Sequence, residues 1–296
     1  MTLAPMHFVL VCVAWANSPW HRERWLRAQL GAHLLQRLND TTITAEAALI
    51  AEDQKWAANP GDWWKSMGHV GQVLSEVLLL RSLVTSSKLI KTVCEIGFNA
   101  GHSAVTLLDG LATNLIEFDL LALPYSNASR RAVELAYPGR IRFKQGMSQL
   151  EVPRHAVLVR SGAEPPCDFW FIDGDHMHGL HLDLRAALSV ASDGAIIVVD
   201  DCLSMHHAVT NAWLSLIDAG HIVNTSNYTQ TLAYPVGRKG WCWGTFQRDP
   251  TRVAALSQTE RDLREARKLR VDPVSAPGWR RLRLAGHVAA DARVVG

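Results

Sequence analysis

The stretch from Lys91 to Ser103, KTVCEIGFNAGHS, constrains the fold more than any other part of the chain. Thr92 to Ile96 is a short apolar run with β-branched residues, which is typical of a buried strand. Gly97 and Gly101 follow it, and Ser103 begins an apolar segment with helical spacing. A strand, a glycine turn and a helix in this order form a nucleotide-type site, because glycine lets the backbone approach a ligand and the helix start offers free N–H groups.

The spacing of this turn narrows the kind of nucleotide. The dinucleotide fingerprint of nicotinamide-dependent oxidoreductases needs a middle glycine where this chain has Asn99, and a Walker loop is absent. The pattern Glu-x-Gly-x-x-x-Gly-x-Ser resembles motif I of the class I S-adenosylmethionine-dependent methyltransferases. An ordinary turn of another α/β protein is the alternative. The resemblance implies that the cofactor is bound by Glu95, Gly97, Asn99, Gly101 and Ser103.

Strands and helices alternate from Lys91 onward, and the strands are continuous apolar runs. This favours a doubly wound, mostly parallel, seven-stranded Rossmann-like α/β sheet with a helical N-terminal extension. The predicted strands are 92–96, 115–120, 140–144, 168–172, 195–199, 222–232 and 241–247. The predicted helices include 21–39, 44–58, 62–85, 127–137, 152–160, 178–190 and 204–219, with Thr42 or Thr44 as the N-cap of the second.

Three regions follow from this pattern. Residues 1–85 are the helical extension, residues 86–248 the cofactor-binding domain, and residues 249–296 a charged helix with a basic tail. The 296 residues, 48% of them hydrophobic, suffice for one such domain with additions. A net charge of +2 with no dense basic block before the C-terminus does not imply a nucleic-acid partner. Whether the chain forms a homo-oligomer is left open.

The compartment is ambiguous from the sequence. Residues 6–16 are apolar and end in an A-x-A pattern typical of signal peptidase sites, but no Lys or Arg precedes them. The run is too short for a stable membrane span. We therefore favour a cytoplasmic location over a cleaved signal peptide at residues 1–16. The five cysteines form no CxxC pair, which favours scattered, unpaired thiols.

Asp119 stands at the end of the second predicted strand, 18 residues after Gly101. Nucleotide folds place an acid there to accept hydrogen bonds from the ribose hydroxyls, so Asp119 is favoured over its competitor Glu117. The segment GMSQ after the third strand is similar to a turn of the catechol O-methyltransferases. That resemblance implies that Ser148 and Gln149 contact the adenine.

Acids also end the fourth and fifth strands. Asp173 follows one, and Asp200 and Asp201 follow the next, at the edge of the sheet where ligands bind. Three carboxylates in a small space suit a hard divalent cation, and Mg²⁺ is the expected ion. The wording IDGDH is similar to that of metal-dependent sugar and macrocycle O-methyltransferases, which implies that His176 is the catalytic base.

These observations together predict a class I O-methyltransferase. S-adenosylmethionine would be the donor, a hydroxyl of a small molecule (a sugar, polyketide or phenol) the acceptor, and a metal ion with a histidine base would activate that hydroxyl. One alternative is an S-adenosylmethionine-binding relative with altered chemistry. The others are a nicotinamide-dependent oxidoreductase, which Asn99 disfavours, and a non-enzymatic secreted module.

Overall fold

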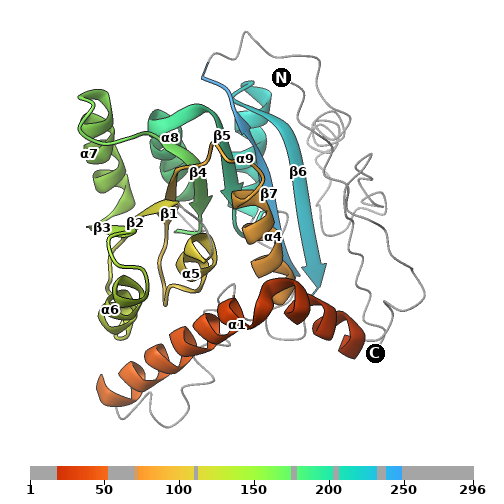
Figure 1. Ribbon diagram of the computed structural model, residues 1–296. Helices are drawn as coiled ribbons and strands as arrows, with labels where there is room; N and C mark the ends of the chain where they lie inside the picture. Colours follow the sequence, from red (N-terminus) through yellow and green to blue (C-terminus); the bar gives the residue numbers. More distant parts are fainter. Residues whose placement is uncertain are drawn as a thin grey trace.

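A seven-stranded sheet with the order β3-β2-β1-β4-β5-β7-β6 forms the centre of the molecule (Figure 1). The computed structural model describes residues 19–52, 71, 73–109, 113–174, 179–202, 207–231 and 238–248. The strands are β1 Thr92–Ile96, β2 Asn114–Asp119, β3 Ile141–Gln145, β4 Cys167–Ile172, β5 Ala191–Val199, β6 Ile222–Thr231 and β7 Arg238–Phe246. The helices are α1 Pro19–Glu52, α4 Leu74–Val84, α5 His102–Leu108, α6 Ser126–Ala136, α7 Ser148–Arg160, α8 Leu180–Val190 and α9 His207–Asp218.

The first five strands run parallel, and β7 pairs antiparallel with both β5 and β6. The predicted doubly wound, mostly parallel α/β sheet is therefore confirmed. The chain order reverses between β1 and β4, so the connections leave these two strands in opposite directions along the sheet. Ligands of open α/β sheets bind at the carboxyl ends of the strands beside such a switch point.

Two apolar layers bury the two faces of the sheet. Trp170 and Ile172 of β4 point into the layer that also contains side chains of α7, α8 and α9. Phe169 and Phe171 alternate with them and pack with side chains of α1, α4 and α5. The parallel strands are buried on both faces for this reason, which explains why they read as continuous apolar runs.

The N-terminal extension differs from the prediction. We expected separate helices over 21–39 and 44–58, but the structure has α1, with its break at Gly31 (φ 79°, ψ 157°). The threonines that resembled helix caps lie inside α1, and Thr42 and Thr44 donate their hydroxyls to carbonyls four residues earlier (3.1 and 2.8 Å). A threonine that bonds back in this way does not interrupt the helix, so its cap-like appearance was misleading.

Element boundaries elsewhere shift by a few residues. Helix α7 begins at Ser148 rather than at residue 152, and β5 begins at Ala191 rather than at residue 195. Of the helix expected over 62–85, the described part is α4. The candidate signal peptide at 1–16, residues 53–70 and the tail from residue 249 lie outside the described residues.

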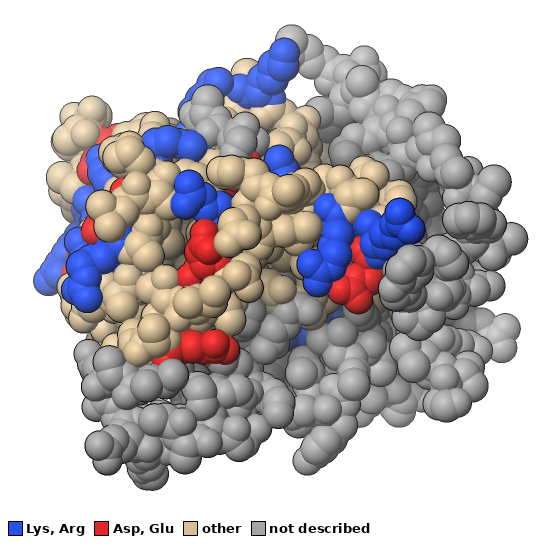
Figure 2. Space-filling model, turned by 60° about the horizontal axis from the view of Figure 1, so that its bottom comes forward, with Lys and Arg blue, Asp and Glu red and all other residues tan. Residues whose placement is uncertain are grey.

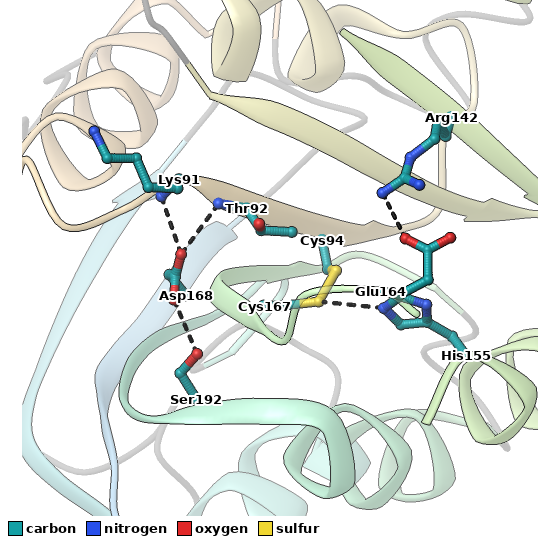
Figure 3. Close-up of a disulfide and its surroundings, with 9 residues drawn as sticks. All are labelled: Lys91, Thr92, Cys94, Arg142, His155, Glu164, Cys167, Asp168 and Ser192. Atoms are coloured by element: carbon teal, nitrogen blue, oxygen red, sulfur yellow. Dashed lines mark hydrogen bonds and ion pairs between the residues drawn. A yellow bond between two sulfur atoms is a disulfide. The ribbon is translucent and has the colours of Figure 1, made fainter. Parts of the chain in front are cut away.

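The expectation of unpaired cysteines is wrong for four of the five. Cys94 of β1 bonds to Cys167 at the start of β4, and Cys202 bonds to Cys242 of β7 (Figure 3 shows the first pair). The separations of 73 and 40 residues gave no local spacing pattern that would reveal the pairs. Cys12 lies outside the described residues.

The start of β4 is held to its neighbours beside the first disulfide. The backbone N–H groups of Lys91 and Thr92 donate to Asp168 Oδ2 (3.0 and 3.1 Å), and the Ser192 hydroxyl donates to Asp168 Oδ1 (2.9 Å; Figure 3). His155 of α7 lies against Cys167. These contacts stabilise the amino ends of β1, β4 and β5, at the edge of the sheet opposite to the acids that follow the strands.

The described surface carries charges of both signs. Figure 2 shows basic and acidic side chains interspersed over the face in view, without one extended patch of a single sign. Among the helices that the structure describes, none combines the length and the apolar character that crossing a bilayer requires.

Candidate active site

The glycine turn after β1 packs tightly against the end of β4. Gly97 has φ 101°, and a Cβ built on it would lie under 3.0 Å from the carbonyl oxygen of Asp173. Only glycine fits there, because both the backbone angle and the space exclude a side chain. The Asp173 N–H in turn donates to the Ile96 carbonyl (2.9 Å). The glycine turn and Asp173, the first predicted metal ligand, therefore fix each other's backbone position.

Asp119, at the end of β2, lies directly against this turn. Its carboxylate accepts hydrogen bonds from the backbone N–H of Phe98 (2.7 Å) and of Leu121 (2.5 Å). A carboxylate that accepts two backbone bonds is fixed in direction. The structure thus brings Asp119 to the glycine turn, while its role towards a ribose stays a prediction.

Asn99 adopts φ 49°, a left-handed conformation that asparagine tolerates better than most residues. Its side-chain oxygen accepts a hydrogen bond from the Tyr125 hydroxyl. Tyr125 is buried, and burial raises its pKa above the ordinary tyrosine value, so the hydroxyl stays protonated and donates. Ala45 of α1 packs with Ala100 and Tyr125, so the second half of α1 covers the glycine turn.

Glu95 and Glu117 lie side by side on β1 and β2, in register with each other and both fully buried. Burial raises the pKa of Glu95 to about 8. Burial, and then the negative charge of Glu95, raise the pKa of Glu117 well above its usual range. At least one of the two carboxyl groups is therefore protonated at neutral pH. Glu117, the competitor of Asp119 in the sequence, points into the protein instead.

The two residues expected at the adenine both contact α8. Ser148 Oγ donates to Asp183 Oδ1 (2.6 Å), and Gln149 Nε2 donates to the same oxygen (2.8 Å). Asp183 is fully buried, and these bonds hold the start of α7 against α8. Whether Ser148 and Gln149 also contact a cofactor stays a prediction. Asp183 escaped the sequence reasoning because an acid in the first turn of a helix is usually solvated there.

The structure aligns the ends of β1, β4 and β5. The Asp200 N–H donates to the Ile172 carbonyl (3.0 Å), one strand along from the bond between Asp173 and Ile96. Asp173, Asp200 and Asp201 therefore share the carboxyl edge of the sheet beside the glycine turn. Their common placement is what the strand pattern predicted.

Strand β7, which lies between β5 and β6 in the sheet, adds a cation to these acids. Lys239 Nζ lies 3.1 Å from Asp200 Oδ2 and 3.3 Å from Asp201 Oδ1. Trp241, two residues further along β7, donates its indole N–H to Asp200 Oδ1. Burial lowers the pKa of Lys239, but the charges of Asp200 and Asp201 outweigh that effect and raise the pKa above the ordinary value. Lys239 is thus a cation held between two carboxylates.

Glu76 brings a fourth acid to the same place. It lies on α4 and is 1% exposed. Burial, and then the charge of Asp200, raise its pKa well above the usual range. A lone acid in the apolar run VLSEVLLL was the available signal for a buried carboxyl, and the sequence reasoning did not use it.

A disulfide secures the strand that carries Lys239. Cys202, next to Asp201, bonds to Cys242, next to Trp241. The backbones approach so closely that a Cβ on Gly240 would lie under 3.0 Å from the Cys202 carbonyl oxygen. The sequence did not reveal that Cys202 and Cys242 are partners, because they stand 40 positions apart.

The acids were expected to bind a divalent cation. Among the described residues, the aspartates do not form a group of three side chains whose donor atoms all lie within 4.8 Å of one another. The group that meets this distance is Cys94, His155 and Cys167, and its two cysteines are joined in a disulfide, so they offer no thiolate. The Asp200 and Asp201 oxygens face an ammonium, which a dication would have to displace. The arrangement as it stands does not fit a divalent ion. The expected base, His176, lies outside the described residues.

Comparison with known proteins agrees with this geometry. Residues 94–202 match the family model of a methyltransferase domain. The cofactor-bound Rv0187 protein from MTB is 16% identical, with a TM-score of 0.52 over 78% of this chain and 99% of that chain. The O-methyltransferase TomG from Streptomyces achromogenes, in complex with SAM, is 17% identical, with a TM-score of 0.50 over 59% of this chain and 80% of that chain.

A search of curated proteins found no match. The two solved structures share the fold, and the family model covers the glycine turn, Asp119 and all three aspartates of the sheet edge. Within residues 94–202 the chain is therefore similar to a methyltransferase domain.

Proposed function

We propose that this enzyme transfers the methyl group of S-adenosylmethionine to a hydroxyl oxygen of a small molecule. The observation that supports the proposal best is the meeting, at one edge of the sheet, of the glycine turn, Asp119 and the acids that follow β4 and β5. The resemblance of the strand-end acids to those of O-methyltransferases favours oxygen as the acceptor atom. TomG, which shares the fold, is an O-methyltransferase, and this agrees with that choice.

The residues around the turn fit the donor chemically. Backbone N–H groups at the start of α5 and the carboxylate of Asp119 offer partners for a carboxylate and for ribose hydroxyls. Glu95 offers a buried carboxyl beneath the turn, where a cationic amine would favour its charged form. We assign cofactor binding to Glu95, Gly97, Asn99, Gly101, Ser103 and Asp119, with Ser148 and Gln149 towards the adenine.

The donor supplies an electrophilic methyl group on a sulfonium, so the protein has to orient the acceptor and remove its proton. We propose that His176 takes this proton, because a neutral imidazole accepts protons near pH 7. No step in this scheme needs a metal ion. Magnesium stays a prediction from the sequence, and the geometry around Asp200 and Asp201 does not favour it.

We assign the cofactor-binding domain to residues 86–248, and we propose that α1 covers its glycine turn. Helix α1 packs over the glycine turn through Ala45, and Thr42 Oγ1 lies 2.9 Å from Nε2 of His102 at the start of α5. The N-terminal extension would therefore help to enclose the donor. An S-adenosylmethionine-binding relative with altered chemistry remains the second candidate.

Calorimetric titration of the full chain with S-adenosylmethionine tests the donor site. We expect one saturable site that is lost in Asp119→Ala and kept in Glu134→Ala, a matched control in which a partly exposed ion pair with Arg130 on α6 is removed. Absence of binding to the wild type would contradict the proposal.

Screening of hydroxyl compounds then tests the reaction. Production of S-adenosylhomocysteine with a hydroxyl acceptor, abolished in His176→Ala, is the expected result. Donor binding without turnover on any hydroxyl or amine acceptor would favour the relative with altered chemistry.

A further inference from the structure

Lys239 occupies the place in this site that the pattern of acids assigned to a metal ion. Its ammonium faces one oxygen of Asp200 and one of Asp201, at 3.1 and 3.3 Å. The second oxygen of Asp200 accepts the indole N–H of Trp241. Both oxygens of Asp200, the first acid of the pair, are thus engaged by residues of β7.

The lysine is built into the site rather than resting on its surface. Its side chain is 19% exposed, and it stands on a strand that the Cys202–Cys242 disulfide fastens to the end of β5. Gly240, beside it, allows the two backbones to approach. A surface lysine that meets an acid by chance has neither a covalent fastening nor this burial.

The charges around the ammonium explain why it is held there. Asp173 and Glu76 act on Lys239 electrostatically in addition to the two acids that it touches. A positive charge amid several carboxylates relieves their mutual repulsion, which is also what a metal ion does in such a cluster. A dication brought within a few ångströms of the ammonium would be repelled by it.

We infer that the ammonium of Lys239 is the resident cation of this site, that it takes the place of a divalent metal ion between Asp200 and Asp201, and that the enzyme works without one. The inference rests on the proposed function in so far as it describes the acceptor side of a methyltransferase. An ammonium presents the same sign of charge to a developing oxyanion as a metal ion does, without a coordination shell that must be assembled first.

Titration with Mn²⁺, followed by calorimetry and by electron paramagnetic resonance, tests this on the full chain without any acceptor. We expect no saturable Mn²⁺ site in the wild type. Lys239→Met keeps the length of the side chain and removes its charge, so this variant should gain one saturable Mn²⁺ site where the wild type has none. Lys239→Arg should remain without a site.

Lys144→Met is the matched control, because Lys144, on β3, also pairs with a partly buried carboxylate, that of Glu164 (3.4 Å). It should gain no Mn²⁺ site. Stoichiometric Mn²⁺ binding by the wild type that disappears in Asp200→Asn would overturn the inference. An unchanged, flat titration of Lys239→Met would overturn it too, provided that circular dichroism shows the variant to be folded.

Titration of the same samples with S-adenosylmethionine separates the two proposals. A wild type that does not bind S-adenosylmethionine would contradict the proposed function. The Mn²⁺ result, in contrast, reports on Lys239 alone. A wild type that binds the donor and also binds Mn²⁺ through Asp200 would leave the proposed function intact and remove the inference.

Discussion

The indole N–H of Trp241 donates to the carboxylate of Asp200, so the antiparallel strand β7 sets the orientation of an acid that terminates the parallel strand β5. The tryptophan is 1% exposed and packs with its ring against Phe171 of β4. Its apolar body and its polar tip therefore act on two different strands.

Replacement of Trp241 by phenylalanine should separate the contribution of its hydrogen bond to Asp200 from that of its ring packing against Phe171. Trp241→Phe keeps most of the buried ring but removes the donor to a charged partner, and we expect a loss of about 1.5–3 kcal/mol in the free energy of unfolding. Urea denaturation measures the change. Trp243→Phe, two residues along the same strand and half-buried, is the control and should cost less. Equal losses in the two variants would show that the bond to Asp200 contributes nothing.

The disulfide pairing makes a prediction about thiols. The four cysteines among the described residues are paired, so none of these four should react in the denatured, unreduced chain, and reduction should expose four additional thiols. Cys202→Ser with Cys242→Ser should lower the free energy of unfolding by about 2–4 kcal/mol, because the unfolded chain loses a cross-link. Titration with a thiol reagent and urea denaturation give the two numbers. Five reactive thiols in the unreduced protein would contradict the pairing.

Disulfides persist mainly in oxidising compartments. From the two pairs we predict the secretory alternative that the N-terminal sequence left open beside a cytoplasmic location. N-terminal sequencing of the mature protein, with residue 17 as the expected start, checks this.

The stability of the protein should fall as the pH rises through the neutral range. The pKa of Glu95 is about 8 in the folded chain and 4.5 in its ordinary state, so the unfolded form releases a proton that the folded form retains. The contribution of the protonated group is fully present below about pH 4.5 and is lost as the pH rises towards 8, with a slope of at most about 1.4 kcal/mol per unit.

Urea denaturation from pH 5 to pH 8.5 measures this slope. Glu95→Gln, which cannot ionise, should flatten it, whereas Glu134→Gln on the exposed face of α6 should leave it unchanged. A slope that is identical in wild type and Glu95→Gln would remove the explanation.

Gly97 and Gly139 both have positive φ, but only Gly97 is closely packed, so alanine substitutions at the two positions separate backbone strain from steric clash. Gly139→Ala has open space around the new Cβ, so only the left-handed backbone is penalised, by about 1 kcal/mol. Gly97→Ala adds a clash with the Asp173 backbone and should cost several times as much, with loss of donor binding. Thermal unfolding and the donor titration measure both. Similar melting temperatures for the two variants would contradict the tight packing of the turn.

The sheet could be predicted because its signals are local. Each parallel strand is a buried apolar run, and the glycine turn and Asp119 follow from their places at strand ends. The break in α1 was misplaced because Thr42 and Thr44 resemble helix caps, while Gly31 bends the helix within an otherwise regular pattern. Local spacing cannot tell these cases apart without the tertiary contacts.

At the acid edge, the part of the sheet edge that carries Asp173, Asp200 and Asp201, the sequence predicted the positions of the acids but not their partners. Strand ends place Asp173, Asp200 and Asp201 together, but the partner of the last two is set by which residues of β7 face them across the sheet. The same holds for Cys202 and Cys242. Pairings between distant segments depend on strand register, which a single sequence does not encode in any short motif.

That register has a consequence for how this protein tolerates change. Lys239 and Trp241 lie on one face of β7 and Cys242 on the other, so a single-residue insertion or deletion just before the strand would turn all three away from their partners at once. A substitution at any one of them would leave the other two contacts in place. Changes of length in this hairpin should thus be far more damaging than changes of residue type, and grafting a loop of another length there would dismantle the acid edge without altering any of its residues.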